Sequence, residues 1–395
     1  MTQFLKNRWL LNKKIGEGSF GEIYQAYDSE LQKNVAIKFE KKTEQRQTIK
    51  LDIAVIHQSK GSKYIPEFIY CGQTETHFFL VMELLGENLS QLRRKQKTST
   101  FSLPTTIKLA IDMICGIEFV HSLGYIHRDI KPSNFAIKNI DSNESYSNLS
   151  PVLSIFDFGL SRKYIDSSGK MKPSRESVGF RGTARYASVA SHEGKELGRK
   201  DDLISLFYCL IEFLYGKLMW SDIKDKQEIL NLKTVFNSSK LPSELPHQFT
   251  TFFEYINSLK ENDEPNYSYL KKLLINTYVS YGFAPNLKFD WEKNSVDYNL
   301  VSSFMASPYK NPNLSVFNFN SQFPNNPQNQ NAFSQKFMNE VLDLKELYGQ
   351  KTNEKRSNSN QEESPTKNQI ADPKQYWKNQ NQKSTSKCAM KCTIF

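Results

Sequence analysis

The sequence His-Arg-Asp-Ile-Lys-Pro-Ser-Asn occupies residues 127–134 of the 395-residue chain, and Asp-Phe-Gly follows at 157–159. Either block alone is compatible with an ordinary loop. Together they supply carboxylate and amide oxygens, which hard divalent cations prefer, and a lysine that can contact phosphate oxygens. The blocks upstream of these two decide whether they form an ordinary loop or a functional site.

Glycines lie far upstream of these blocks in the pattern G-x-G-x-x-G, at Gly16, Gly18 and Gly21. Their usual role is only to make a turn. Residues with strand character flank them on both sides, which predicts a hairpin and argues against a dinucleotide-binding unit, where such glycines open a helix. A glycine hairpin lets backbone N–H groups approach phosphates because no side chains intervene.

An apolar run with one lysine, Val-Ala-Ile-Lys at 35–38, comes next and predicts a second strand region. A single strand lysine usually faces solvent. The glycine hairpin 17–22 residues before it weakens that interpretation, because this spacing is expected in a small antiparallel sheet.

Four such blocks in this order resemble those of eukaryotic protein kinases, and more narrowly the casein kinase 1 group, closest to the tau-tubulin kinase branch. The narrower resemblance is carried by Phe-Arg-Gly-Thr-Ala-Arg-Tyr-Ala-Ser at 180–188, where most kinases have Ala-Pro-Glu, and by supporting stretches at 199–203, 220–226 and 289–293.

The resemblance covers about residues 8–293. It implies an α+β, two-lobed kinase fold: a small antiparallel-sheet N-lobe (about 8–82), a hinge (83–86) and a mainly helical C-lobe (about 87–293).

The catalytic roles that the resemblance implies divide among five residues. Asp129 would accept the proton of the substrate hydroxyl, and Lys131 would steady the γ-phosphate of ATP. Asn134 and Asp157 would hold Mg²⁺, and Lys38 would hold the α- and β-phosphates. A lysine at position 131 favours serine or threonine over tyrosine as the acceptor.

The resemblance also implies a nucleotide pocket. Its residues are Ile15, Gly16, Gly18, Gly21, Ile23, Ala36, Lys38, Met82, Glu83, Leu85 and Ala136. Met82 would guard the back of the pocket, and the backbone of Glu83 and Leu85 would make the hinge hydrogen bonds to adenine.

One position departs from the kinase pattern. The helix glutamate that should pair with Lys38 falls on Asp52, which is one methylene shorter. The pair then needs a helix shift or a bridging water. Two interpretations stay open: an active kinase, or a weakened pseudokinase that acts as a nucleotide-binding scaffold at a membrane or on microtubules.

A central helix expected at 202–215 would supply Asp202, which resembles the buried brace of the catalytic loop. Its apolar residues are expected in the core: Phe207, Tyr208, Leu210, Ile211 and Leu214.

Basic residues near the activation segment bind phosphate or acidic side chains in the resembled group. Arg185 matches one of them, Arg128 is nearby, and Lys224 and Lys226 are weaker candidates. A guanidinium pair suits phosphate geometry; the alternative is a surface arginine without a ligand. The substrates implied are proteins with acidic or pre-phosphorylated sites, tubulin or tubulin-associated proteins among them. The missing Ala-Pro-Glu suggests that activation-loop phosphorylation is not required, and we expect a monomer.

Residues 294–395 form a different region, in which 301–395 hold 15 Asn and 10 Gln. Such a composition predicts a mostly disordered tail. Phe337, Val341, Leu344 and Tyr348 share one helix face, so a docking helix at 334–348 or a transient helix is expected there.

The net charge of +10 divides evenly, because the tail from 301 carries 12 basic and 7 acidic residues. Five lysines from 374 onward lead to Cys392, whose terminal Cys-Thr-Ile-Phe (392–395) predicts prenylation; Cys388 is a candidate for palmitoylation. The start shows no signal-peptide pattern, and five widely spaced cysteines suggest reduced thiols. A cytoplasmic protein anchored to a membrane is predicted. Nucleic-acid binding is not, because basic and aromatic residues do not interleave.

Overall fold

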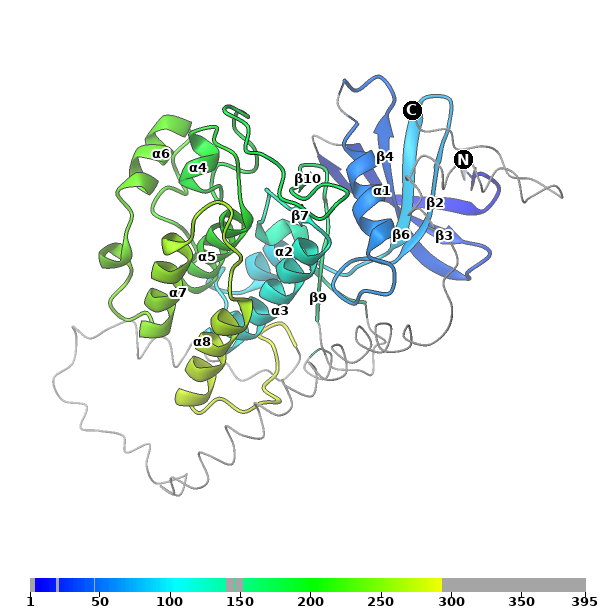
Figure 1. Cartoon of the computed structure of the whole chain (residues 1–395). Helices are drawn as coiled ribbons and strands as arrows, with labels where there is room; N and C mark the ends of the chain where they lie inside the picture. Colours follow the sequence, from blue (N-terminus) through cyan, green and yellow to red (C-terminus); the bar gives the residue numbers. More distant parts are fainter. Residues whose placement is uncertain (1–3, 19–20, 46, 140–145, 147–151, 293–395) are drawn as a thin grey trace, which may run out of the picture. The chain divides into compact units, whose positions relative to one another are not determined.

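A computed structural model describes residues 4–18, 21–45, 47–139, 146 and 152–292 (Figure 1). Six strands form one antiparallel sheet in the order β1-β2-β3-β4-β6-β5. They are β1 (Phe4–Leu5), β2 (Trp9–Gly18), β3 (Gly21–Asp28), β4 (Lys33–Lys41), β5 (Phe68–Gln73) and β6 (His77–Glu83). Helix α1 (Ile49–Gln58) packs against strands of this sheet.

Alternation along β4 gives the sheet two faces. Val35 and Ile37 point into an apolar cluster on one face, and Ala36 and Lys38 point to the opposite face. Leu5 joins that apolar cluster and pairs with Trp9, so the sheet begins at β1, ahead of the expected start at residue 8.

Asp28 ties β2 to β3 beside the apolar cluster. Its buried carboxylate accepts hydrogen bonds from the Arg8 guanidinium (2.8 Å) and from the Trp9 indole N–H (2.8 Å). Burial alone would raise the pKa of Asp28, but the bonds from Arg8, Trp9 and two backbone N–H groups lower it to about 2.

The predicted glycine hairpin is confirmed, because β2 and β3 pair from Trp9↔Asp28 to Gly18↔Gly21. Gly21 has φ +121°, and a Cβ at this position would lie 1.9 Å from the carbonyl oxygen of Phe39. Only glycine therefore lets β3 pass so close to β4.

The other lobe is mainly helical (Figure 1). Its helices are α2 (Leu89–Lys95), α3 (Leu103–Ser122), α4 (Val189–His192), α5 (Arg199–Tyr215), α6 (Lys226–Thr234), α7 (His247–Ser258) and α8 (Tyr267–Ser280). Short strands β7 (Tyr125–Ile126), β8 (Phe135–Ile137), β9 (Leu153–Ile155) and β10 (Arg162–Lys163) and the 3-10 turns η1 (Pro132–Asn134) and η3 (Ser238–Lys240) complete it. The α+β, two-lobed kinase fold predicted from the sequence is thus confirmed.

Helix α5 is the centre of this lobe and packs against α3 and α7. It begins three residues before the expected 202, because the Asp201 carboxylate accepts the N–H of Gly198 (2.8 Å) and caps the first turn. Four of the five expected core residues are buried. Leu214 is only half-buried, in the last turn before the left-handed Gly216 (φ +78°).

The last described stretch is fastened to the start of α3. Asp290 accepts hydrogen bonds from the Ser102 N–H (2.7 Å), the Ser102 hydroxyl (2.6 Å) and the Thr105 hydroxyl (2.8 Å). The predicted tail helix at 334–348, Cys388 and Cys392 lie outside the described residues.

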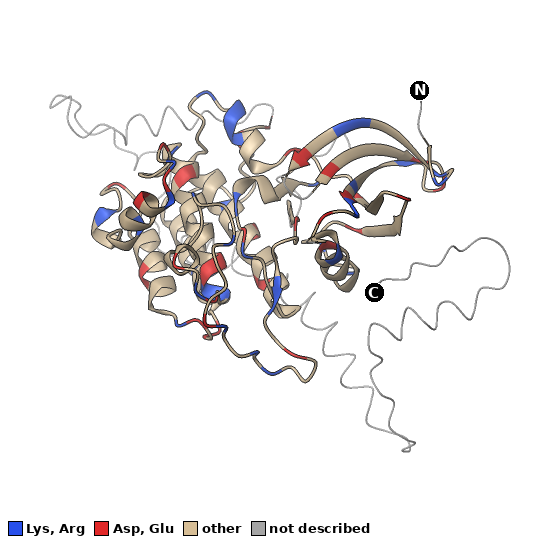
Figure 2. Ribbon diagram, turned by 90° about the horizontal axis from the view of Figure 1, so that it is seen from above, with Lys and Arg blue, Asp and Glu red and all other residues tan. Residues whose placement is uncertain are grey.

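In the described part of the chain, neither the distribution of charge nor the hydrophobicity of the helices marks out a special surface or a membrane span. Figure 2 shows basic and acidic segments interspersed over the ribbon. No described helix is both long and apolar enough to cross a bilayer.

Candidate active site

A cleft of about 780 Å³ lies where residues of both lobes converge. This is within the usual range for a small-molecule site, roughly 300–1,000 Å³. All the nucleotide-pocket residues predicted from the sequence line the cleft, as do Asn134 and Asp157. Ile15, Ile23 and Ala36 come from the sheet, and Ala136 comes from β8 of the helical lobe.

The hinge side of the cleft has part of its backbone already engaged. The Glu83 N–H donates to the Glu67 carbonyl (3.0 Å), and the Leu84 carbonyl accepts from the Asn139 amide (2.6 Å). The N–H of Glu83 and the carbonyl of Leu84 are therefore already used within the protein.

Lys38 is the buried cation of the cleft. Its Nζ lies 2.7 Å from Asp52 Oδ2 and 2.9 Å from Asp157 Oδ1. Burial alone would lower the pKa of Lys38, but the two carboxylates raise it, so the ammonium ion stays charged. Burial also opposes ionisation of Asp157, yet Lys38 holds the pKa of that carboxyl below its ordinary value.

Asp52 reaches Lys38 without a bridging water, although it is a methylene shorter than the expected glutamate. Its second oxygen, Oδ1, accepts the backbone N–H of Phe158 at 2.6 Å. One buried carboxylate on α1 therefore contacts both the strand lysine and the Asp-Phe-Gly segment.

Glu40 fixes the beginning of α1, and the sequence analysis missed it. Its buried Oε2 accepts the Thr48 hydroxyl (2.5 Å) and the backbone N–H of Ile49 (2.9 Å), one turn before Asp52. A carboxylate at a helix N-terminus satisfies orphan N–H groups and complements the helix dipole. The available signal was the Lys-x-Glu spacing on one face of β4.

Asp129 lies at the entrance to the helical lobe with its carboxylate held on both oxygens. The Lys131 ammonium is 2.6 Å from Oδ2, and the Thr183 hydroxyl donates to Oδ1 at 2.8 Å. The amide N–H of Asn134 donates to the carbonyl of Asp129 (2.9 Å), so the amide oxygen of Asn134 points away from that carbonyl. Thr183 was also missed, because nothing distinguishes a threonine within the 180–188 stretch.

Asp202 occupies the bracing position predicted for it. Its carboxylate accepts the backbone N–H groups of His127 and Arg128 (2.8 Å each) and contacts the His121 ring at 2.8 Å. Burial would raise the pKa of Asp202, but the bonds with His121 and the His127 N–H lower it. The brace holds Arg128 at φ +67°, a strained backbone angle for a side-chain-bearing residue.

The predicted pair of phosphate-binding arginines needs a correction at Arg128. Its guanidinium is buried and donates to the carbonyl of Leu160 (2.8 Å) and, more weakly, to that of Ser161 (3.4 Å). The side chain therefore holds residues 160–161, where the activation segment begins after Asp-Phe-Gly, and is not presented to a substrate.

Arg185 remains 42% exposed, but both terminal nitrogens of its guanidinium have partners, and one of them donates to the Ser221 carbonyl (3.2 Å). It lies 3.1 Å from Glu212 Oε1, a buried carboxylate that also accepts the Tyr186 hydroxyl (2.6 Å). Lys224 and Lys226 are exposed, and Lys226 Nζ sits 4.5 Å above the ring of Phe180. Glu212 was not singled out from the sequence.

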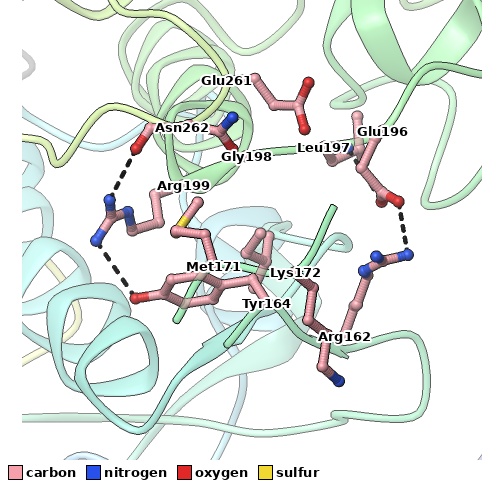
Figure 3. Close-up of a pocket in the computed structure, with 11 residues that line it drawn as sticks. Arg162, Tyr164, Met171, Lys172, Glu196, Leu197, Gly198, Arg199, Glu261 and Asn262 are labelled. Atoms are coloured by element: carbon pink, nitrogen blue, oxygen red, sulfur yellow. Dashed lines mark hydrogen bonds and ion pairs between the residues drawn. The ribbon is translucent and has the colours of Figure 1, made fainter. Parts of the chain in front are cut away.

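A smaller hollow lies beside the activation segment, between β10 and the start of α5 (Figure 3). Arg162 pairs with Glu196 there, and Arg199 donates to the Tyr164 hydroxyl (3.3 Å) and the Asn262 carbonyl (3.1 Å). The hollow holds about 20 Å³, room for one water molecule. These contacts anchor the segment.

Two features define the protein kinase class in this two-lobed fold: the pair of Lys38 with Asp52 in the cleft, and the loop of Asp129 held by Asp202. Residues 9–277 match the protein kinase domain family, so the chain belongs to that family. A probable serine/threonine-protein kinase of Dictyostelium discoideum is 47% identical over 288 residues. The matching stretch covers 73% of this chain and 57% of that protein, so the chain spans little more than half of its relative's length.

Proposed function

We propose that this chain is an ATP-dependent serine/threonine protein kinase. The observation that carries the proposal is the Asp129 carboxylate, held between Thr183 and Lys131. Lys131 lines the cleft in which Lys38 is paired with Asp52 and Asp157. Phosphoryl transfer depends mainly on positioning and charge stabilisation, and these groups supply both.

Each group has one task in this reaction. Asp129 accepts the proton of the serine or threonine hydroxyl as its oxygen attacks the γ-phosphate of ATP. Lys131, beside Asp129, neutralises charge on the transferred group. Lys38 binds the α- and β-phosphates, and the backbone of Glu83 and Leu85 holds the adenine at the hinge.

Asn134 and Asp157 suit a divalent metal, because an amide oxygen and a carboxylate are hard ligands. Two protein ligands also fit Mg²⁺, which ordinarily completes its shell with phosphate oxygens and water. When bound, Mg²⁺ neutralises negative charge that develops on the phosphates.

The competing interpretation, a pseudokinase scaffold at a membrane or on microtubules, had Asp52 as its only support. The direct 2.7 Å contact of Asp52 with Lys38 favours an active enzyme instead.

The test is transfer of labelled phosphate from ATP to casein in the presence of Mg²⁺. Lys38→Met and Asp129→Asn should each reduce transfer to background. Asp129→Asn should keep the wild-type unfolding temperature within a few degrees, whereas Lys38→Met should lower it, because it leaves the carboxylates of Asp52 and Asp157 without their cation. Appreciable activity in both variants would refute the assignment of the site.

We further propose that the kinase belongs to the casein kinase 1 group, near the tau-tubulin kinase branch, and favours acidic or pre-phosphorylated sites. The 180–188 stretch supports the group, and Arg185 with Lys224 and Lys226 supports the preference. Tubulin and tubulin-associated proteins are the substrates to test first. A matched peptide pair, phosphorylated and unphosphorylated beside the same acceptor serine, measures the preference. Equal kcat/KM for the two peptides would exclude it.

The proposed cellular form is a monomer on the cytoplasmic face of a membrane, prenylated at Cys392. The lysines from 374 onward and palmitoylated Cys388 would provide the second signal that a single lipid needs for stable attachment. Cys392→Ser should move the full-length chain to the soluble fraction. An unchanged membrane fraction would contradict the proposal, and Cys388→Ser measures the contribution of the second lipid.

A further inference from the structure

A buried lysine outside the cleft has no role in the chemistry described above. Lys233, on α6, is only 2% exposed, and its Nζ donates to the carbonyl oxygens of Ala184 (2.7 Å) and Ala187 (2.5 Å). Within the described ranges, no aspartate or glutamate oxygen lies within ion-pair distance of it. A buried ammonium ion without a carboxylate is rare and costly, because the charge loses its hydration.

Aromatic rings and a histidine complete its surroundings. The rings of Tyr208 and Trp220 each have their centroid 5.0 Å from Nζ, and His192 Nε2 is 3.4 Å away. Ring faces stabilise a desolvated cation. Burial lowers the pKa of Lys233, which the two carbonyls and the ring faces oppose, so the site holds this ammonium ion at a cost in free energy.

The carbonyls that Lys233 binds stand at either end of one short segment, 184–187. Of the two carbonyls between them, that of Arg185 accepts the indole N–H of Trp220 (2.7 Å). His192 contacts the Ala184 carbonyl at 3.1 Å. Side chains from α4, from α6 and from the loop before α6 therefore hold three carbonyls of a four-residue segment.

That segment connects the substrate side of the site to the catalytic aspartate. It carries Arg185, the most exposed of the arginines considered for substrate binding, and it follows directly on Thr183, whose hydroxyl donates to Asp129. The backbone N–H groups of Tyr186 and Ala187 both return to the Thr183 carbonyl (2.9 Å each). A displacement of segment 184–187 therefore moves the peptide-facing surface and the contact with Asp129 together.

We propose that Lys233 is a positioning residue for the protein substrate: its ammonium ion ties both ends of segment 184–187 to α6 and sets where Arg185 stands relative to Asp129. Three donors on one small charged group suit two carbonyls that approach from different directions. The proposal rests on the proposed kinase function and deepens it, because it separates the binding of the protein substrate from the binding of ATP.

Lys233→Met tests the proposal in the full-length chain, because methionine has similar length but no donors. With casein as substrate, the KM for casein should rise at least about 10-fold, and the KM for ATP should stay within about twofold of wild type. Slow hydrolysis of ATP without casein should also be retained, because water needs no peptide-facing surface. Lys240→Met, at an exposed lysine on η3, is the matched control and should match wild type.

Trp220→Phe is the second variant, because it removes only the donor to the Arg185 carbonyl and keeps a ring beside Lys233. It should raise the KM for casein about threefold, and this result decides the matter if Lys233→Met does not fold. An unchanged KM for casein in the folded variants, or a parallel loss of ATP binding, would overturn the proposal. If the wild-type chain itself transfers no phosphate to casein, the proposed function fails instead, and the two failures are distinguishable.

Discussion

Replacing Asp52 with the glutamate that other kinases carry should weaken this enzyme. Both Asp52 oxygens are engaged, with Lys38 at 2.7 Å and the Phe158 N–H at 2.6 Å, and the side chain is 2% exposed. An added methylene displaces the carboxylate by about 1.5 Å. Forcing extra volume into a packed site costs roughly 1–3 kcal/mol. If that strain falls on the cleft, kcat/KM drops about 5- to 150-fold, since 1.36 kcal/mol is one decade.

The assay is kcat/KM for ATP with casein at saturation, with Asp52→Asn as the companion variant. Asparagine keeps the shape but removes the charge, so Lys38 is left with Asp157 as its ionic partner, and activity should be lower than that of Asp52→Glu. Unfolding temperatures of both variants separate a damaged cleft from a damaged fold. Faster phosphate transfer by Asp52→Glu than by the wild type would refute the reasoning and show that aspartate is a weakening substitution.

Three further predictions concern residues outside that pair. The pKa of Asp28 is lowered to about 2, so its contribution to stability is complete above pH 4 and is lost as the pH falls toward 2. Urea titrations measure the difference in unfolding free energy between wild type and Asp28→Asn. This difference should be about 1 kcal/mol smaller at pH 3 than at pH 5. A constant difference would contradict this. Thr183→Ala removes a hydrogen bond to a charged group and should lower kcat for casein about 10-fold, whereas Thr183→Ser should retain most of it. Glu212→Gln removes the negative charge beside Arg185, whose guanidinium also donates to the Ser221 carbonyl. It should lower the KM for a phosphorylated peptide about threefold relative to its unphosphorylated form. An equal change for both peptides would show that Glu212 does not tune selectivity.

Most of the fold and most of the residues that line the cleft could be predicted from short motifs, because the residue types in those motifs act locally. The glycine hairpin follows from the absence of side chains at Gly16, Gly18 and Gly21. The strand with Lys38 follows from an apolar run around one lysine. The central helix with Asp202 follows from the resemblance of its sequence to the kinase pattern. These patterns need no knowledge of distant contacts.

The residues that sequence reasoning missed depend on partners far along the chain. Glu212 meets Arg185 from 27 positions away, and Lys233 meets Ala184 from 49 positions away. Arg128 was misjudged for the same reason, because its acceptors, Leu160 and Ser161, lie on a segment that folds back over it. A lysine or arginine in a sequence carries no sign of whether a carbonyl will reach it.

Glu40 restricts the movement of α1 relative to the sheet of the small lobe. It lies two residues from Lys38 on one strand, and it caps the helix that carries Asp52. Strand β4 and helix α1 are thus joined by two contacts, Lys38 with Asp52 and Glu40 with the N-terminus of α1. An outward movement of α1 would break both contacts at once and leave the buried carboxylate of Glu40 without its hydrogen-bond donors. We therefore expect α1 to keep its position relative to β4 whether or not nucleotide is bound. Hydrogen exchange across α1 should accordingly be equally slow with and without nucleotide.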